Sequence, residues 1–90
     1  MPNPKDLRVG DLVRFISTPE EWSQPGYCIH AMSRRFMKKM ILRTWPARVY
    51  EIDEWGYPWI RAIFYERGKR HYHSWAVTES TGWRKVLRRI

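Results

Sequence analysis

Residues 27–43 carry the clearest hydrophobic pattern of the chain, with apolar side chains recurring every three or four positions. At 100° per residue these side chains share one side of a helix, while cations occupy the opposite side. The apolar positions are Ile29, Met32, Phe36, Met37, Met40 and Ile41, and the cationic ones are Arg34, Arg35, Lys38 and Lys39. No glycine or proline interrupts this stretch, and Pro46 follows it; proline disfavours helix in the residue before it. The pattern therefore predicts an amphipathic α-helix over 27–43.

Other segments alternate apolar and polar residues with the two-residue period of β-strands, and they are rich in β-branched and aromatic side chains. They span 8–17, 47–53, 59–66, 71–77 and 83–87. In the first segment Val13 and Phe15 share one face. In 59–66 the expected core positions are Ile60, Ala62 and Phe64, and the expected outer positions are Trp59, Arg61, Ile63 and Tyr65. We therefore expect a β-meander of short strands joined by tight turns.

The strand over 71–77 is the one whose buried face the pattern does not decide. Either His71, His73, Trp75 and Val77 point outward, or Tyr72, Ser74 and Ala76 do. Both sets contain apolar and polar members, so the alternation supports either arrangement. The two alternatives stay open at the level of the sequence.

The chain has 90 residues, a length that favours one domain and excludes an enzyme with a separate cofactor domain. We expect residues 1–6 to form a flexible leader and residues 7–90 to form the domain, with the helix inserted at about 27–43. The single cysteine, Cys28, cannot form an internal disulfide, which fits a reducing cytoplasm. No stretch approaches the roughly 20 apolar residues of a membrane span. A cytoplasmic protein without a membrane span is the expectation.

The order of the strands resembles that of the SH3-like small β-barrels. The resemblance rests on GDLVRF, on the meander ARVYEID, WIRAIFYE and HYHSWAV, and on the TESTG corner before WRKVL. It implies a mainly β fold, a five-stranded SH3-like barrel with one α-helix after the first strand. The connection after the first strand often carries ligand contacts in this superfamily, and here it would hold the helix. The ALYDY-type motif of proline-binding SH3 domains is absent, so no ligand-binding residue of those domains is assigned to this chain. The segments DEWGYPWI and HSWAV also resemble an uncharacterised bacterial family, and that resemblance implies no function.

Charge gives the strongest indication of function. The formal net charge is +8, and no Asp or Glu occurs from Trp22 to Tyr50. The cations of this region are Arg34, Arg35, Lys38, Lys39, Arg43 and Arg48, and Arg84, Lys85, Arg88 and Arg89 follow near the C-terminus. Clustered cations favour polyanions, because neutralising phosphates releases condensed counterions. We therefore expect a non-catalytic module that binds nucleic acid, with Trp59, Arg61 and Tyr65 as contacts on the adjacent sheet face. The simpler alternative is that the cations only keep one face of the helix solvated.

A second hypothesis is a protein-interaction module. Exposed Trp and Tyr residues would then bind a peptide or partner protein, or the methionines of 27–43 would form a homodimer or grip a partner. Helices normally bury such an apolar stripe, so we expect the methionines to dock on the end of the barrel instead.

Metal chemistry is a distant third hypothesis. Cys28, His30, His71 and His73 are residue types that bind zinc, but their spacing matches no standard zinc motif and no CxxC pair is present. The glycines required for a phosphate-binding loop or a dinucleotide fingerprint are also missing. We therefore expect no cofactor and no catalysis, with a small metal-dependent enzyme as the distant alternative.

Overall fold

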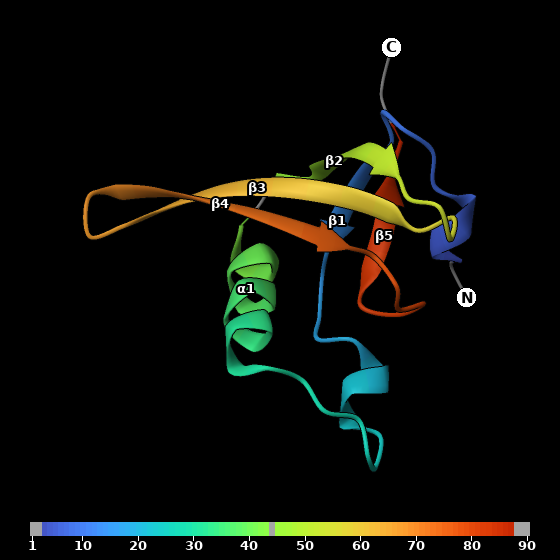
Figure 1. Ribbon diagram of the computed structural model, residues 1–90, viewed down its shortest axis with the longest axis horizontal. Coiled ribbons are helices and arrows are strands. Elements are labelled where there is room, and N and C mark those ends of the chain that lie inside the picture. The colour runs from blue at the N-terminus through green and yellow to red at the C-terminus, as the bar shows by residue number, and fades with distance from the viewer. Residues whose placement is uncertain (1–2, 44, 88–90) are drawn as a thin grey trace.

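The computed structural model describes residues 3–43 and 45–87 as a mainly β protein with one α-helix (Figure 1). The strands are β1 (Leu12–Phe15), β2 (Ala47–Ile52), β3 (Pro58–Glu66), β4 (Lys69–Ala76) and β5 (Trp83–Val86). The helices are η1 (Pro4–Asp6) and η2 (Glu20–Ser23), both 3-10, and α1 (Ala31–Leu42). The predicted class and the insertion of the helix after the first strand are thus confirmed.

The strands form one antiparallel sheet in the order β4-β3-β2-β1-β5. β1 pairs with both β2 and β5, and β4 and β5 lie at the two edges. No pairing joins these edges within the described residues, so the sheet is open and a closed barrel is not confirmed.

The strand bounds differ from those predicted by one residue in most places, and the starts of β1 and β4 are displaced further by local turns. β1 begins only at Leu12, since Arg8–Asp11 form a turn in which the Arg8 N–H donates to Asp11 Oδ2 at 2.8 Å. β4 begins earlier, at Lys69, since Arg67 and Gly68 adopt φ values of 52° and 77°. Positive φ at both central residues gives the twist of a two-residue hairpin turn. The β3–β4 hairpin is therefore longer than the alternation indicated.

α1 is shorter than predicted at its N-terminus. His30 is the N-cap, with an extended backbone (ψ 143°), and its Nδ1 accepts a hydrogen bond from the Met32 N–H at 3.1 Å. A side chain that satisfies a free N–H in this way marks the start of a helix. Residues 27–30 therefore precede the helix and have no regular secondary structure. No helix in the described ranges is long and apolar enough to cross a membrane.

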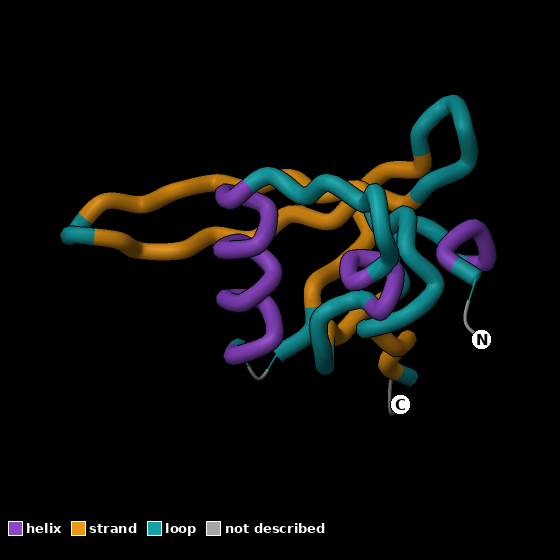
Figure 2. The backbone as a smooth tube through the Cα atoms, turned by 90° about the horizontal axis from the view of Figure 1, so that it is seen from below, coloured by secondary structure: helices purple, strands orange, loops and turns teal. Residues whose placement is uncertain are grey.

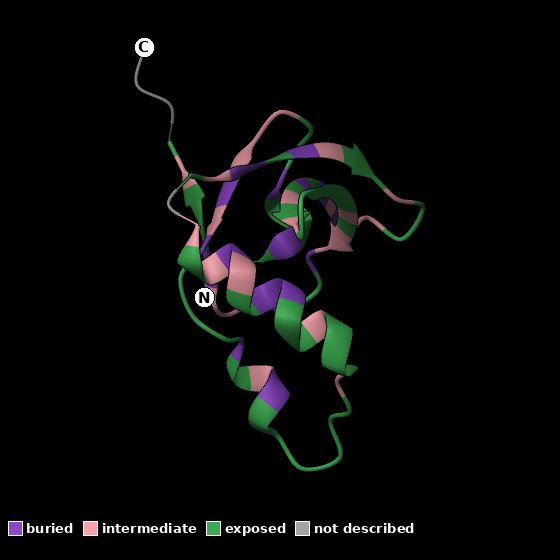
Figure 3. Cartoon of the chain, turned by 90° about the vertical axis from the view of Figure 1, so that its left-hand side faces the viewer, coloured by how far each residue is buried: buried purple, intermediate pink, exposed green. Residues whose placement is uncertain are grey.

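The apolar side of α1 packs on one face of the sheet, which we call the inner face. Phe36, Met37 and Met40 are buried in a core that includes Val13 and Val49; the buried positions of α1 are purple in Figure 3. Met32, by contrast, is 66% exposed. Most of the methionine stripe therefore belongs to the core of this chain, and Met32 is its exposed member.

The register of β3 and β4 decides which face of β4 is buried. Ile60 and Ala62 face the core as predicted, and they pair with Trp75 and His73. Directly paired residues lie on the same face of a sheet, so His73 and Trp75 point inward and Tyr72 and Ser74 point outward. This result settles the choice that the sequence left open.

The loop that contains η2 is held by a buried carboxylate. Glu79 is 7% exposed and its Oε1 accepts from Trp22 Nε1 at 2.9 Å, while its carbonyl accepts from Trp83 Nε1 at 2.7 Å. Glu21 accepts from the Ser80 N–H at 2.7 Å. These bonds fix the residues around η2 against the segment before β5.

Part of the predicted leader has regular structure. Pro4–Asp6 form η1, capped by Asn3 Oδ1, which accepts from the Lys5 N–H at 3.0 Å. Pro4 is buried. The flexibility and the end of the leader stay predictions.

Candidate functional site

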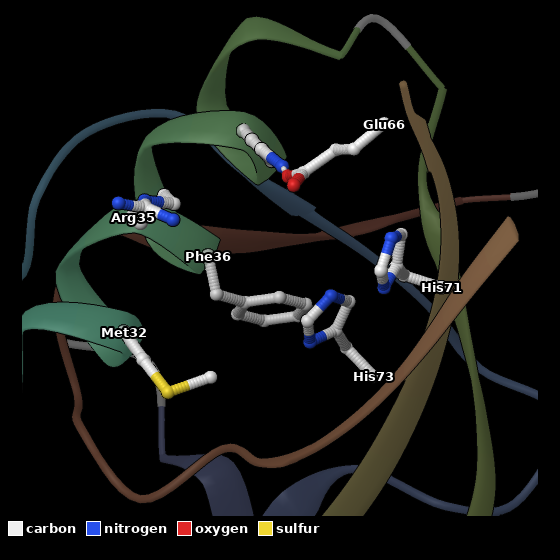
Figure 4. Close-up of a pocket in the computed structure, with 7 residues that line it drawn as sticks. Met32, Arg35, Phe36, Glu66, His71 and His73 are labelled. Carbon is white, nitrogen blue, oxygen red and sulfur yellow. Dashed lines mark ion pairs between the residues drawn. The ribbon is translucent and has the colours of Figure 1, made fainter. Parts of the chain in front are cut away.

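A groove lies between α1 and the inner face of the β3–β4 hairpin (Figure 4). Its central cavity has a volume of about 170 Å³, and two adjoining cavities of about 150 Å³ and 400 Å³ share residues with it. The lining residues are Met32, Ser33, Arg35, Phe36, Lys39, Glu66, Arg67, Lys69, His71, His73, Ser74 and Trp75. We call this continuous feature the α1–β4 groove.

Simple periodicities bring these residues together. Met32, Arg35 and Lys39 follow one another at three- and four-residue intervals, so they line one side of α1. His71 and His73 are two residues apart on β4, so they share its inner face. Figures 1 and 2 show that the hairpin passes α1 and projects beyond it, so the part of β3 and β4 before the tip lies beside the helix. The groove is thus formed by one helix side and one strand face.

Aromatic rings form the floor of the groove. The Phe36 ring stacks on Trp75 with a centroid distance of 5.1 Å and an interplanar angle of 22°. His73 lies 5.3 Å from Phe36 and 5.8 Å from Phe64. In Figure 4 the rings of Phe36 and His73 lie side by side, with Met32 at one end. Phe36 is itself buried, so the half-buried rings of His73 and Trp75 supply the flat surface that is open to another planar group.

The rim of the groove is cationic. Arg35, Lys39, Arg67 and Lys69 line it, and Glu66 is the one carboxylate among the lining residues. Lys39 forms an ion pair with Glu66, and the remaining three cations have no such partner among the described residues. Burial, together with the charges of Lys39 and His71, holds the pKa of His73 below its ordinary value of 6.5. The potential in the groove therefore favours an anion.

The six cations predicted as one polyanion site occupy different places. Arg34, Arg35 and Lys38 are exposed on α1, and Lys39 lies in the groove. Arg43 instead donates to the backbone carbonyls of Trp45 and Pro46 at 2.9 and 3.0 Å, and burial lowers its pKa. Arg48 is exposed on β2, and the buried neighbours Ala47 and Val49 place it on the outer face of the sheet, away from α1. Arg43 therefore has a structural role, and Arg48 does not join the helix cations.

Two of the three residues of the predicted aromatic contact face lie away from the helix. Trp59, Arg61 and Tyr65 occupy the outer face, opposite the buried Ile60 and Ala62. Trp59 Nε1 donates to Asp53 Oδ2 at 3.0 Å, and the Arg61 guanidinium lies 4.2 Å from the centroid of the Tyr50 ring. The sheet lies between the cationic helix and Trp59 and Arg61, so the prediction that these two residues adjoin the helix is wrong. Tyr65 instead lines a cavity at the edge of β3 together with Lys39 and Arg43.

The C-terminal cations form a third location. Arg84 and Lys85 belong to β5, at the edge of the sheet opposite β4, and Lys85 lies 3.4 Å from Asp11. Arg88 and Arg89 lie outside the described residues. The described C-terminal cations therefore do not extend the groove.

The four possible zinc ligands are not gathered at one point. Cys28 is exposed in the loop before α1, His30 caps the helix, and His71 and His73 line the groove. In the part of the chain that the structure describes, no three His, Cys, Asp or Glu side chains are arranged to hold a metal ion.

Sequence reasoning missed Arg67 and Lys69 as site residues and treated His71 and His73 only as possible metal ligands. The signal that could have found them is the Arg-Gly turn, which predicts a two-residue hairpin and carries these cations to its tip.

No protein-family model matches this chain, and no curated protein and no solved structure is significantly similar to it. The function must therefore be argued from the groove itself.

Proposed function

We propose that this protein is a non-catalytic module that binds single-stranded nucleic acid in the α1–β4 groove. The observation that carries the proposal is the combination of a cationic rim with an aromatic floor. Arg35, Arg67 and Lys69 would neutralise phosphates, and the release of counterions would drive binding. Arg34 and Lys38, exposed on the same helix, would extend the phosphate path.

The aromatic floor favours a single strand over a duplex. Unstacked bases can lie against aromatic side chains, and each such contact contributes about 1–3 kcal/mol in single-strand binding proteins. Bases within a duplex are already stacked and paired, so their flat faces cannot reach His73 and Trp75. The groove volumes, about 150–400 Å³ for each section, suit individual bases and phosphates.

The proposal also includes the fold family and the location in the cell that the sequence led us to expect. An SH3-like barrel is supported by β1, which pairs with β2 on one side and with β5 on the other. A cytoplasmic location rests on the lone, exposed Cys28.

Fluorescence anisotropy with a labelled uridine oligomer of about 12 nucleotides tests the proposal. The variant Arg35→Glu/Lys69→Glu reverses two groove cations, and the matched control Arg48→Glu/Arg61→Glu reverses two cations of the outer face. We expect the groove variant to weaken binding by at least about tenfold and the control by no more than about threefold. The slope of log affinity against log salt should become shallower by about 1.4 in the groove variant, since each phosphate contact contributes about 0.7.

The control distinguishes a site from net charge. Equal losses in the two variants would mean that the protein attracts RNA only through its excess of cations, and the groove would have no special role. Unchanged affinity in the groove variant would refute the proposal outright. Far-UV circular dichroism of both variants checks that the fold is retained.

A further inference from the structure

Half of β3 lacks a partner strand on one side. β2 pairs with β3 only from Pro58 to Ile60, whereas β4 pairs with it from Trp59 to Glu66. Within the described ranges no strand pairs with β3 beyond Ile60 on the side of β2. Figure 1 shows this part of the hairpin projecting past the end of β2.

The backbone groups of Ile63 and Tyr65 point to this open edge. The Val77 N–H donates to the Pro58 carbonyl at 2.9 Å, so position 58 is bonded to the β4 side. Bonded and non-bonded pairs alternate along an antiparallel ladder. Even-numbered residues of β3 therefore bond to β4, and odd-numbered residues direct their N–H and C=O groups away from it.

An apolar groove runs beside the same edge, with a volume of about 700 Å³. It is lined by Lys39, Leu42, Arg43, Trp45, Ile63, Phe64, Tyr65 and Glu66, and we call it the β3-edge groove. Leu42, Trp45 and Tyr65 are 74%, 61% and 72% exposed. Clustered exposed apolar side chains mark interaction surfaces.

The free edge of β3 also lacks the usual protection against strand pairing. Edge strands commonly carry lysine, proline or bulges that discourage another strand. The edge of β4 has Lys69 and Arg70, whereas the free half of β3 is charged only at its ends, Arg61 and Glu66, and residues 62–65 between them are Ala, Ile, Phe and Tyr. An unprotected edge beside an apolar groove can accept a strand through main-chain hydrogen bonds, with side-chain pockets providing specificity.

We propose that the β3 edge binds an extended acidic segment of a partner protein as an added β-strand. Ile63 and Tyr65 would contact apolar side chains of that strand on the outer face. Lys39 and Arg43, from α1 and its C-cap, line the groove on the inner side, beside the alternate positions of that strand. Because Lys39 is paired with Glu66 and Arg43 is bonded to two carbonyls, the preference for acidic side chains rests on the net charge of +8. A second copy of this chain, with a net charge of +8, would bring cations against cations. This binding site lies beyond the proposed nucleic-acid function and does not depend on it.

Amide hydrogen exchange followed by NMR tests the proposal. The probe is a blocked peptide of about seven residues that alternates valine and glutamate. We expect the Ile63 and Tyr65 amides to exchange at least about tenfold more slowly with peptide, because they acquire hydrogen-bond partners. The Phe64 amide, already bonded to β4, should change little. An otherwise identical peptide with lysine in place of glutamate should bind at least about tenfold more weakly, because its charges repel the rim.

Two tryptophan variants locate the contact. Trp45→Ala removes a wall of the β3-edge groove and should weaken peptide binding by about fivefold or more. Trp55→Ala, which alters an equally exposed tryptophan in the turn between β2 and β3, should leave it unchanged.

Several results would overturn the proposal. Protection at Tyr72 and Ser74 in place of Ile63 and Tyr65 would assign the peptide to the edge of β4. Protection of Ile63 and Tyr65 without peptide, rising with protein concentration, would make the occupant a second copy. Absence of protection would exclude strand addition. The Arg35→Glu/Lys69→Glu variant should retain peptide binding, so failure of one proposal is distinguishable from failure of the other.

Discussion

Replacing Met37 with alanine tests whether the methionines of α1 form core, as the structure has them, or a surface for a partner. Met37 is 1% exposed and packs in the same buried cluster as Val13 and Ile60. Met32 lies five positions earlier on the same helix and is 66% exposed. The two residues therefore have the same chemistry in opposite environments.

The magnitudes expected for the two substitutions differ widely. A buried Met→Ala change removes apolar contacts and leaves a cavity, at a cost of about 2–5 kcal/mol in the free energy of unfolding. A substitution on the exposed surface usually changes it by less than about 0.5 kcal/mol. A domain of this size has a total free energy of unfolding of roughly 5–13 kcal/mol. Met37→Ala should therefore remain largely folded but be clearly less stable.

Urea unfolding followed by tryptophan fluorescence measures the difference. For a loss of about 3 kcal/mol and an m-value of about 1–3 kcal/mol/M, the midpoint for Met37→Ala should fall by roughly 1–3 M. Met37→Leu conserves volume and should cost less than about 1.5 kcal/mol, which keeps the test usable if the alanine variant unfolds. Equal midpoints for Met37→Ala and Met32→Ala would refute the docking of α1 on the sheet.

Two further predictions concern backbone strain and pH. Gly82→Ala should lower the melting temperature, because φ is +86° and the added Cβ would lie 2.6 Å from the Ser17 carbonyl oxygen. Gly26→Ala, where φ is +81° and the Cβ would meet open space, should lower the melting temperature less. Equal decreases in melting temperature by differential scanning calorimetry would contradict the steric argument. Since the pKa of His73 is lower in the folded than in the unfolded chain, the unfolded chain takes up a proton first as the pH falls below about 6.5, and the free energy of unfolding should decrease there. His73→Gln should remove that decrease in urea titrations at pH 7.5 and 5.5, whereas His71→Gln should retain most of it.

Much of the fold follows from local periodicity. The 3.6-residue pattern located α1, since Phe36, Met37 and Met40 must lie on one side of any helix through them. The two-residue pattern identified the core positions of β3, with Ile60 and Ala62 buried as predicted. These features depend on neighbours along the chain, which the sequence displays directly.

The other features depend on contacts between distant segments. The buried face of β4 is decided by its register with β3, and neither set of alternating residues is apolar enough to show it alone. The start of α1 depends on a histidine acting as N-cap, a role usually filled by Ser, Thr, Asp or Asn. The burial of Glu79 depends on Trp22, 57 residues away in the sequence.

The candidate site shows the same limit. Charge counting found Arg35 and Lys39 but could not tell on which side of the sheet α1 lies, so it joined them to Trp59 and Arg61. The path of the hairpin, not its composition, brings Lys69 beside the helix. The cations that are close together in the sequence thus form only one side of the groove, and folding brings the hairpin that forms the other side.

The most direct test of the α1–β4 groove is an NMR titration of the isotope-labelled protein with a uridine oligomer. We predict that resonances of Arg35, Lys69 and His73 shift in proportion to binding, while the Trp59 Nε1–H, bonded to Asp53 on the outer face, stays in place. Shifts at Trp59 and Arg61, with the groove resonances unmoved, would contradict the account.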